Sequence, residues 1–250
     1  MKEKVFAVGD IHGEYDLLKK LLDRWKEEEE TLVFLGDLGD RGPKSKECFL
    51  LVQDLVTSNR AVCLSGNHED IFLSWLDNPE EKFMWYLRNG GQETLESLLY
   101  PGVLEEKTPQ ELAKEIQATY PDLITFMRDL PLYYETDFCI CVHAGIDLDL
   151  EDWRETSRRD FLWSRADFYA NPKTPEKLVV FGHTPVQYLH GDSSDTSLWH
   201  QNARLNIDGG AVYEGALHGV VISDQGLEED HQIFHPNYQL PESKDASSVG

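Results

Sequence analysis

Five short apolar runs in this 250-residue chain are each followed at once by a turn that carries His, Asp or Asn. Runs of four or five apolar residues that end at glycine turns are typical of buried strands. The first three alternate with stretches of helical apolar spacing, so the chain begins β-α-β-α-β and predicts a parallel sheet with right-handed crossovers. The runs are Val5–Val8, Thr31–Leu35, Ala61–Leu64, Phe138–Val142 and Leu178–Phe181.

The polar residues that follow these runs are expected to meet, because ligand sites in open α/β sheets form outside the carboxyl ends of the strands. Imidazole, carboxylate and amide groups together suit Mn, Fe, Zn or Ni better than Ca, which prefers oxygen ligands alone. The sequence therefore predicts a two-metal site that hydrolyses phosphoesters. The candidates are Asp10, His12, Asp37, Asp40, Arg41, Asn67, His68, His143 and His183.

The stretch from about residue 71 to residue 130 has a different texture, with aromatic residues at helical spacing. No Ser/Gly-rich linker brackets it, so we interpret it as a helical insertion within a single domain of residues 1–235. The polar stretch 236–250 is expected to be a flexible tail. Further strands are expected at Leu132–Tyr134, Arg204–Ile207, Leu217–Ser223 and Gln232–Phe234.

The formal charge of −23 argues against nucleic acid or an anionic membrane as a partner, since both are polyanions. Acidic runs such as Glu228-Glu229-Asp230 are expected in solvated loops and at helix ends. No apolar run approaches the ~20 residues of a membrane span, and the chain enters a strand without a visible secretory signal. The four cysteines lack CxxC spacing and are expected to be buried free thiols, which favours a cytoplasmic location.

The motifs after the apolar runs stand in a fixed order along nearly the whole chain. They are Gly9–Gly13, Gly36–Gly42, Gly66–Glu69, His143–Gly145 and Gly182–Thr184. This ordered set resembles the calcineurin-like metallophosphoesterases, and most closely their Ser/Thr phosphoprotein phosphatase branch in its bacterial and lambda-phage form. The resemblance implies a four-layer α-β-β-α sandwich of two mixed sheets, with the metal site at the carboxyl ends of the strands.

The resemblance also implies a role for each site residue. Two divalent transition-metal ions are expected, with Mn as the first choice and Fe, Zn or Ni as alternatives. The first ion would be held by Asp10, His12 and Asp37, and the second by Asp37, Asn67, His143 and His183. A metal-bridging hydroxide would attack phosphorus, and His68, paired with Asp40, would act as the general acid. Arg41 and Arg165 would bind the phosphate, as the planar guanidinium fork allows.

Three functions remain open at this point. The first is hydrolysis of phosphomonoesters, in particular phosphoserine and phosphothreonine in proteins, and His12, Asp40 and Glu69 favour it. The second is hydrolysis of diadenosine tetraphosphate by a related branch, to which Arg41-Gly42-Pro43 is similar. The third is a non-catalytic phosphate-binding scaffold, which would have no need of a proton donor. The expected partner is a phosphorylated protein or a small phosphoester, and Glu69 has no assigned role.

Overall fold

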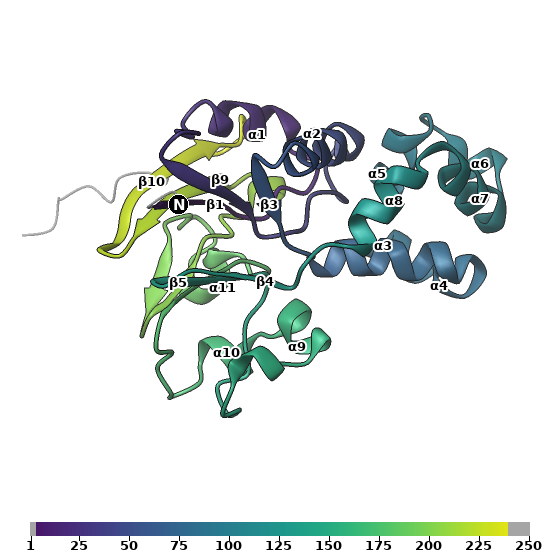
Figure 1. Ribbon diagram of the computed structural model, residues 1–250. Coiled ribbons are helices and arrows are strands. Elements are labelled where there is room, and N and C mark those ends of the chain that lie inside the picture. The colour runs from purple at the N-terminus through teal and green to yellow at the C-terminus, as the bar shows by residue number, and fades with distance from the viewer. Residues whose placement is uncertain (1–3, 240–250) are drawn as a thin grey trace, which may run out of the picture.

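Two five-stranded sheets form the centre of the chain in the computed structural model, which describes residues 4–239 (Figure 1). The strands are β1 (Lys4–Val8), β2 (Glu30–Phe34), β3 (Ala61–Cys63), β4 (Tyr133–Glu135), β5 (Cys139–Val142), β6 (Leu178–Phe181), β7 (Trp199–Gln201), β8 (Arg204–Asn206), β9 (Ala216–Ser223) and β10 (Gly226–Phe234). The first sheet has the order β10-β9-β1-β2-β3, and the second has the order β4-β5-β6-β8-β7.

Both sheets are mixed. In the first, β1, β2 and β3 are parallel, whereas β9 runs antiparallel to β1 and to β10. In the second, β5, β6 and β8 are parallel, and β4 and β7 are antiparallel edge strands. The parallel core of each sheet brings several strand ends to the same edge, where the predicted site residues follow.

Alternating side chains in β1 define the layers. Phe6 and Val8 pack toward the helices outside the first sheet, while Val5 and Ala7 pack against the second sheet. A third apolar cluster lies outside the second sheet and includes Phe161. The helices that cover the two outer faces are α1 (Tyr15–Leu22), α2 (Ser45–Thr57), α9 (Arg158–Trp163) and α10 (Ala166–Tyr169). This arrangement confirms the predicted α-β-β-α sandwich.

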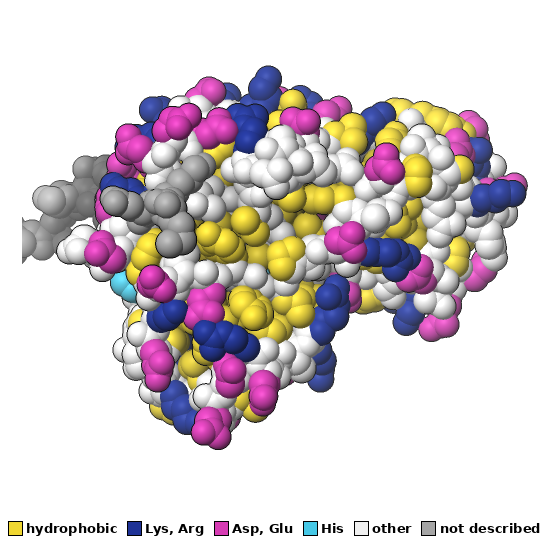
Figure 2. All heavy atoms as spheres, viewed as in Figure 1, with side chains coloured by type: hydrophobic (Ala, Val, Ile, Leu, Met, Phe, Trp, Pro, Cys, Tyr) yellow, Lys and Arg dark blue, Asp and Glu magenta, His cyan; other side chains and the backbone are white. Residues whose placement is uncertain are grey.

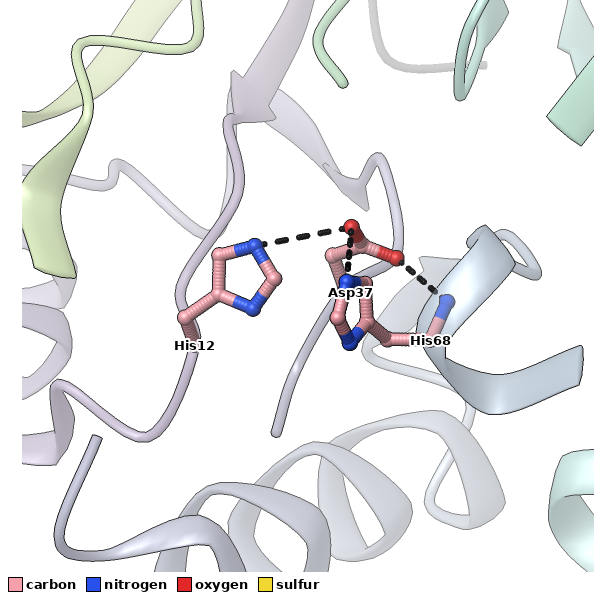
Figure 3. A group of neighbouring side chains, drawn as sticks. All are labelled: His12, Asp37 and His68. Carbon is pink, nitrogen blue, oxygen red and sulfur yellow. Dashed lines mark hydrogen bonds and ion pairs between the residues drawn. The ribbon is translucent and has the colours of Figure 1, made fainter. Parts of the chain in front are cut away.

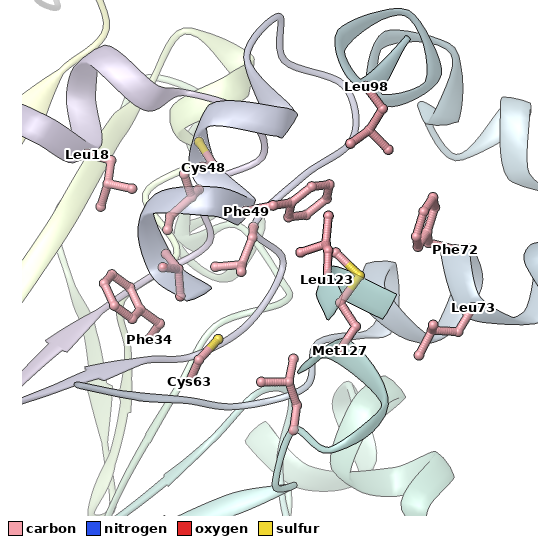
Figure 4. Packing of buried hydrophobic residues seen from close by; sticks show 14 of the residues in the cluster. Leu18, Phe34, Cys48, Phe49, Cys63, Phe72, Leu73, Leu98, Leu123 and Met127 are labelled. Atoms are coloured by element: carbon pink, nitrogen blue, oxygen red, sulfur yellow. The ribbon is translucent and has the colours of Figure 1, made fainter. Parts of the chain in front are cut away.

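Six helices lie between β3 and β4 and project beyond the edge of the sheets (Figure 1). They are α3 (Asn67–Asp77), α4 (Pro79–Arg88), α5 (Gly91–Leu98), α6 (Val103–Glu106), α7 (Pro109–Thr119) and α8 (Pro121–Arg128). Their apolar side chains belong to the same cluster as the outer face of the first sheet: Phe34 and Phe49 continue into Phe72, Leu123 and Met127 (Figure 4). The assignment of residues 1–235 to one domain stays a prediction, and most of the expected tail, residues 240–250, lies outside the described residues.

One expectation about local structure was wrong, and one strand was not predicted. The acidic run Glu228-Glu229-Asp230 lies in β10 rather than in a loop or at a helix end. Charged residues are compatible with this position because β10 is an edge strand, where one side of the strand faces solvent. The short edge strand β7 was not predicted, since Trp199–Gln201 carries no apolar alternation.

The surface and the cysteines follow the composition. On the face shown in Figure 2, acidic side chains are spread over the sandwich and the insertion, with Lys and Arg among them. All four cysteines are free and buried, as predicted, and Cys139 and Cys141 both face the other sheet. Among residues 4–239, none of the helices has the length and apolar character that a membrane span needs.

Candidate active site

All six predicted metal ligands are buried and lie in one continuous set of contacts. His12 Nε2 and His143 Nε2 each lie 3.5 Å from a carboxylate oxygen of Asp37. Asn67 Oδ1 lies 2.8 Å from both His143 Nε2 and His183 Nδ1. The backbone N–H of His183 donates to the Asp10 carboxylate at 3.1 Å, which closes the set. Residues from five strand ends thus meet where the sheets come together.

The turns that hold these residues have an unusual backbone. His12, Asp37, Asp40, Arg41 and His183 all adopt positive φ angles, between 46° and 70°. This left-handed region is uncommon for residues other than glycine, and such strain collects at functional sites where the surrounding structure enforces it. All five of these residues lie in turns that the sequence motifs marked, whereas other residues with positive φ, such as Asn59 and Glu214, lie elsewhere.

Asp37 is the centre of the arrangement. Two groups of three side chains have ligand atoms within 4.8 Å of one another, and both contain Asp37. One group adds His143 and His183, and the other adds His12 and His68. Figure 3 shows ring nitrogens of His12 and His68 directed at the Asp37 carboxylate. A carboxylate with two oxygens can serve two cations, so this geometry is compatible with a bridging role for Asp37.

Three of the histidines have the form that binds a metal. Burial lowers the pKa of His12, of His143 and, to about 2, of His183, so each imidazole is neutral. His12 donates its Nδ1–H to Gly39 O at 2.8 Å, and His143 donates its Nδ1–H to Leu35 O at 3.0 Å. Metal-binding histidines characteristically donate their other nitrogen to a carbonyl in this way, which leaves the Nε2 lone pair for the ion.

The unsatisfied atoms of the site also fit a pair of cations. His183 Nε2 is buried and has no hydrogen-bond partner. His143 Nε2, which carries no proton in this tautomer, faces the Asn67 Oδ1 acceptor. Burial, Asp208 and Asp37 raise the pKa of Asp10, and burial raises the pKa of Asp208 to about 6. Closely spaced buried carboxylates and unprotonated imidazoles form a donor set that divalent transition metals satisfy.

His68 differs from the other three histidines. Burial alone would lower its pKa, but Asp37 and the hydrogen bond with Asp40 raise the pKa of His68 above its ordinary value. His68 Nδ1 lies 2.7 Å from Asp40 Oδ2, and His68 Nε2 lies 4.0 Å from Asp37 Oδ2. A charged imidazolium repels a metal ion and can donate a proton, so the electrostatics favour the acid role over ligation.

Two residues of the helical insertion hold Asp40, and sequence reasoning missed both. Tyr86 Oη donates to Asp40 Oδ1 at 3.0 Å, and Thr94 Oγ1 donates to the same oxygen at 2.6 Å. Both side chains are fully buried, on α4 and α5. Nothing in the sequence indicated this contact, because Tyr86 and Thr94 lie about 50 residues beyond Asp40 in a stretch of ordinary helical spacing.

Glu69, which had no role from the sequence, supports the loop that carries Asp37. Its two carboxylate oxygens accept hydrogen bonds from the backbone N–H groups of Asp37, Leu38 and Gly66, at 2.8–2.9 Å. Burial and the proximity of Asp37 raise the pKa of Glu69 to about 7, although the three N–H donors oppose the shift. The sequence contained one signal for this role, since Glu three residues after a helix N-cap is the capping-box position.

Arg41 and Arg165 both line a cavity of about 290 Å³ that opens beside His12, His183 and Asp208. Arg41 Nη1 lies 2.6 Å from His12 Nε2, and Arg165 Nη1 donates to Thr184 Oγ1 at 2.9 Å. Asp208, which follows β8, also lines this cavity. Two guanidinium groups on its wall are compatible with binding of an anion such as a phosphate group.

Curated proteins similar to this chain share most of its length. A bis(5'-nucleosyl)-tetraphosphatase (asymmetrical) of Bacillus subtilis is 29% identical over 238 residues, which cover 85% of this chain and 88% of that protein. The corresponding protein of Halalkalibacterium halodurans is 27% identical, with 84% and 86% covered. A symmetrical bis(5'-nucleosyl)-tetraphosphatase of Dechloromonas aromatica is 28% identical, with 98% and 79% covered.

Solved structures confirm the architecture. A candidate diadenosine tetraphosphatase superposes with a TM-score of 0.63 at 20% identity, covering 95% of this chain and 96% of that one. A serine/threonine phosphatase of Saccharomyces cerevisiae gives a TM-score of 0.50 at 16% identity, with 94% and 82% covered. The sequence model of the calcineurin-like phosphoesterase family matches residues 3–211. The chain, with its strand-end residues gathered around Asp37, therefore belongs to the calcineurin-like phosphoesterases.

Proposed function

We propose that this chain is a metal-dependent hydrolase of dinucleoside polyphosphates, the second of the three functions left open by the sequence. The observation that carries the proposal is that relatives matching most of the chain are named asymmetrical or symmetrical bis(5'-nucleosyl)-tetraphosphatases. The phosphoprotein reading has less support, because the serine/threonine phosphatase neighbour is similar in fold alone. A small substrate also agrees with the cavity that Arg41 and Arg165 line beside the site.

The residues that would hold the metals are the six that the motifs predicted. Asp10, His12 and Asp37 would hold one ion, and Asp37 with Asn67, His143 and His183 would hold the other. The neutral imidazoles, the unpartnered His183 Nε2 and the clustered carboxylates support this assignment. When bound, two such cations stabilise negative charge on phosphate oxygens and supply an activated water at neutral pH. His12 would have to give up its contact with Arg41 to take part.

The chain's own residues would perform the remaining steps. Arg41 and Arg165 would bind the phosphate oxygens and orient the group to be cleaved, since both face the cavity. His68 would donate its proton to the departing oxygen, and Asp40 would hold the imidazolium by the 2.7 Å contact at Nδ1. In a polyphosphate the departing group is itself a phosphate, a weak base, so it needs this proton less than the alkoxide of a phosphoserine would.

The test is a substrate panel with Mn²⁺, Fe²⁺, Zn²⁺ and Ni²⁺ supplied in turn, because the ligand set does not select one ion. We expect diadenosine tetraphosphate to be cleaved with a kcat/KM at least tenfold above that for a phosphoserine peptide. Chromatography of the products identifies the bond that is cut, since central cleavage yields two ADP and off-centre cleavage yields ATP and AMP. A tenfold preference for the phosphopeptide would refute the proposal.

Variants connect the activity to the site. Asp37→Asn should reduce turnover of diadenosine tetraphosphate by two orders of magnitude or more. His68→Asn should reduce it by a smaller factor, about tenfold, because the departing phosphate needs the proton less. Asp54→Asn, which changes an exposed carboxylate on α2, is the matched control and should leave turnover at the wild-type level. Binding of the nucleotide without hydrolysis by any metal-loaded form would instead support the scaffold reading.

A further inference from the structure

Two tyrosines border the arginine-lined cavity and are largely exposed to solvent. Tyr188 on α11 (Val186–His190) is 78% exposed, and Tyr213 in the short helix η2 (Ala211–Tyr213) is 59% exposed. Both line the cavity that contains Arg41 and Arg165, and both also line an adjoining hollow of about 530 Å³. Ligand pockets are characteristically lined by aromatic side chains together with a few polar groups, so exposed aromatic rings at the mouth of a polar site indicate a binding surface.

The segments that carry these rings lie close to His183 and Asp208 in the chain and contact each other. The segments that carry them are joined by two hydrogen bonds, from Val186 N to Asp208 O and from Gln187 Nε2 to Gly209 O, each 2.9 Å. Tyr188 lies five residues beyond His183, and Tyr213 lies five residues beyond Asp208. A ligand that touches the tyrosines would therefore be positioned with respect to the phosphate-binding residues.

The charges nearby restrict what such a ligand can be. The Arg41 guanidinium lies over the Tyr213 ring, 5.6 Å from its centroid, and Arg165 lines the same cavity. A ligand that fills both regions needs negative charge at one end and a flat π-face at the other. Nucleosides with a phosphate chain combine these features, whereas inorganic polyphosphate lacks the flat face.

We propose that Tyr188 and Tyr213 form a stacking platform for one nucleobase of the substrate, whose phosphate chain extends between Arg41 and Arg165 toward the metal ligands. The proposal rests on the proposed function and adds the means by which the nucleoside is recognised. Stacking of a base on an aromatic side chain is largely independent of base identity, because every base presents a π-face. The platform therefore selects nucleotides over other phosphoesters and discriminates little between purine bases.

The experiment compares AMP with ribose 5-phosphate, which carries the same phosphate and sugar without a base. Binding of each to the manganese-loaded protein is measured by isothermal titration calorimetry, which does not depend on turnover. In the wild-type protein AMP should bind about 10- to 100-fold more tightly than ribose 5-phosphate. The double variant Tyr188→Leu/Tyr213→Leu should lose most of this preference, and Tyr188→Phe/Tyr213→Phe should keep it.

Trp85→Leu is the matched control, because it removes a partly exposed ring from α4, outside the cavity, and should keep the preference. A Leu double variant that retains the wild-type preference, or a Phe double variant that loses it, would overturn the platform. The two proposals fail separately. Loss of base preference in the Leu variant supports the platform even if diadenosine tetraphosphate proves not to be the substrate, and cleavage of that substrate stands even if the preference is unaffected.

Discussion

The contact between the helical insertion and Asp40 gives a quantitative prediction. Tyr86 and Thr94 donate hydrogen bonds of 3.0 and 2.6 Å to the same carboxylate oxygen, and both are fully buried. A hydrogen bond to a charged group contributes about 1.5–3 kcal/mol. Tyr86→Phe removes one donor and should lower the free energy of unfolding by about that amount. Thr94→Val also removes the oxygen that accepts a 2.9 Å hydrogen bond from the Asp40 backbone N–H, so it should lower the free energy of unfolding by at least as much.

The double variant should lose more than the sum of the two single variants. When one donor remains, Asp40 Oδ1 still has a partner, but the double variant leaves a buried carboxylate oxygen without any of the partners seen here. Leaving a buried charged group unpaired adds a desolvation penalty beyond the lost bonds, so we expect a coupling free energy of about 1 kcal/mol or more. Turnover should fall with stability, on the order of tenfold, because Asp40 orients the proton donor His68.

Urea unfolding of the metal-free variants measures these free energies, and thermal unfolding should show about 2–4 °C of lowered Tm per kcal/mol for a chain of this size. Tyr100→Phe is the control, since the Tyr100 hydroxyl makes a 3.0 Å bond to Glu106 at the surface and should contribute little. The reasoning is refuted if Tyr86→Phe is no more destabilising than Tyr100→Phe. It is also refuted if the two single effects are additive within about 0.3 kcal/mol.

Two further predictions concern the carboxylates of Asp230 and Glu69. Asp230→Asn should lower the free energy of unfolding by about 1–2 kcal/mol at neutral pH, because it removes a charged acceptor of a 2.8 Å hydrogen bond with His218. Burial alone would raise the pKa of Asp230, but the bond with His218 lowers it. A carboxyl group whose pKa is lowered in the folded protein stabilises the fold at pH values above its ordinary pKa, near 4, and this stabilisation is lost as the pH falls further. The difference in Tm between the wild type and Asp230→Asn should therefore shrink on acidification. A difference that is the same at pH 3 as at neutral pH would contradict this. Glu69→Ala should lower the free energy of unfolding by about 3 kcal/mol or more, because the N–H groups around Asp37 lose their acceptor. It should also weaken manganese binding measured by calorimetry. Glu81→Ala, which changes an exposed side chain, is the control, and an equally small effect of Glu69→Ala would exclude a supporting role for Glu69.

Much of the fold could be predicted from local pattern. The runs that became β1, β2, β5 and β6 are continuous and apolar because their strands are largely buried on both faces, which is a strong signal in a single sequence. Two of the four edge strands among residues 4–239, β7 and β10, were harder to predict. β7 was missed and the acidic part of β10 was misread, since an edge strand needs neither an apolar run nor a polar loop composition.

The substrate class was the property that the sequence motifs predicted least well. By resemblance, His12, Asp40 and Glu69 favour the phosphoprotein branch, whereas relatives that match most of the chain are named tetraphosphatases. In the structure, His12 contacts the carbonyl of Gly39, and Glu69 accepts from the Asp37 N–H, so both support the loop that carries Asp37. Asp40 holds His68, the predicted proton donor. Such roles serve cleavage of any phosphoester, so residues of this kind carry little information about the remainder of the substrate.

The sequence by itself determined which residues would gather at the end of each sheet, because parallel strands bring the residues that follow them to one edge. Asp10, His12, Asp37, Asn67, His143 and His183 could therefore be named in advance. The packing of the two sheets then brought the two groups of residues together. Only the tertiary structure decided how His68 differs from the other histidines, and which side chains support the site from elsewhere in the chain. Those properties depend on burial and on contacts across long sequence separations, such as Tyr86 with Asp40 and the tyrosines beside Arg41, and no local pattern encodes them.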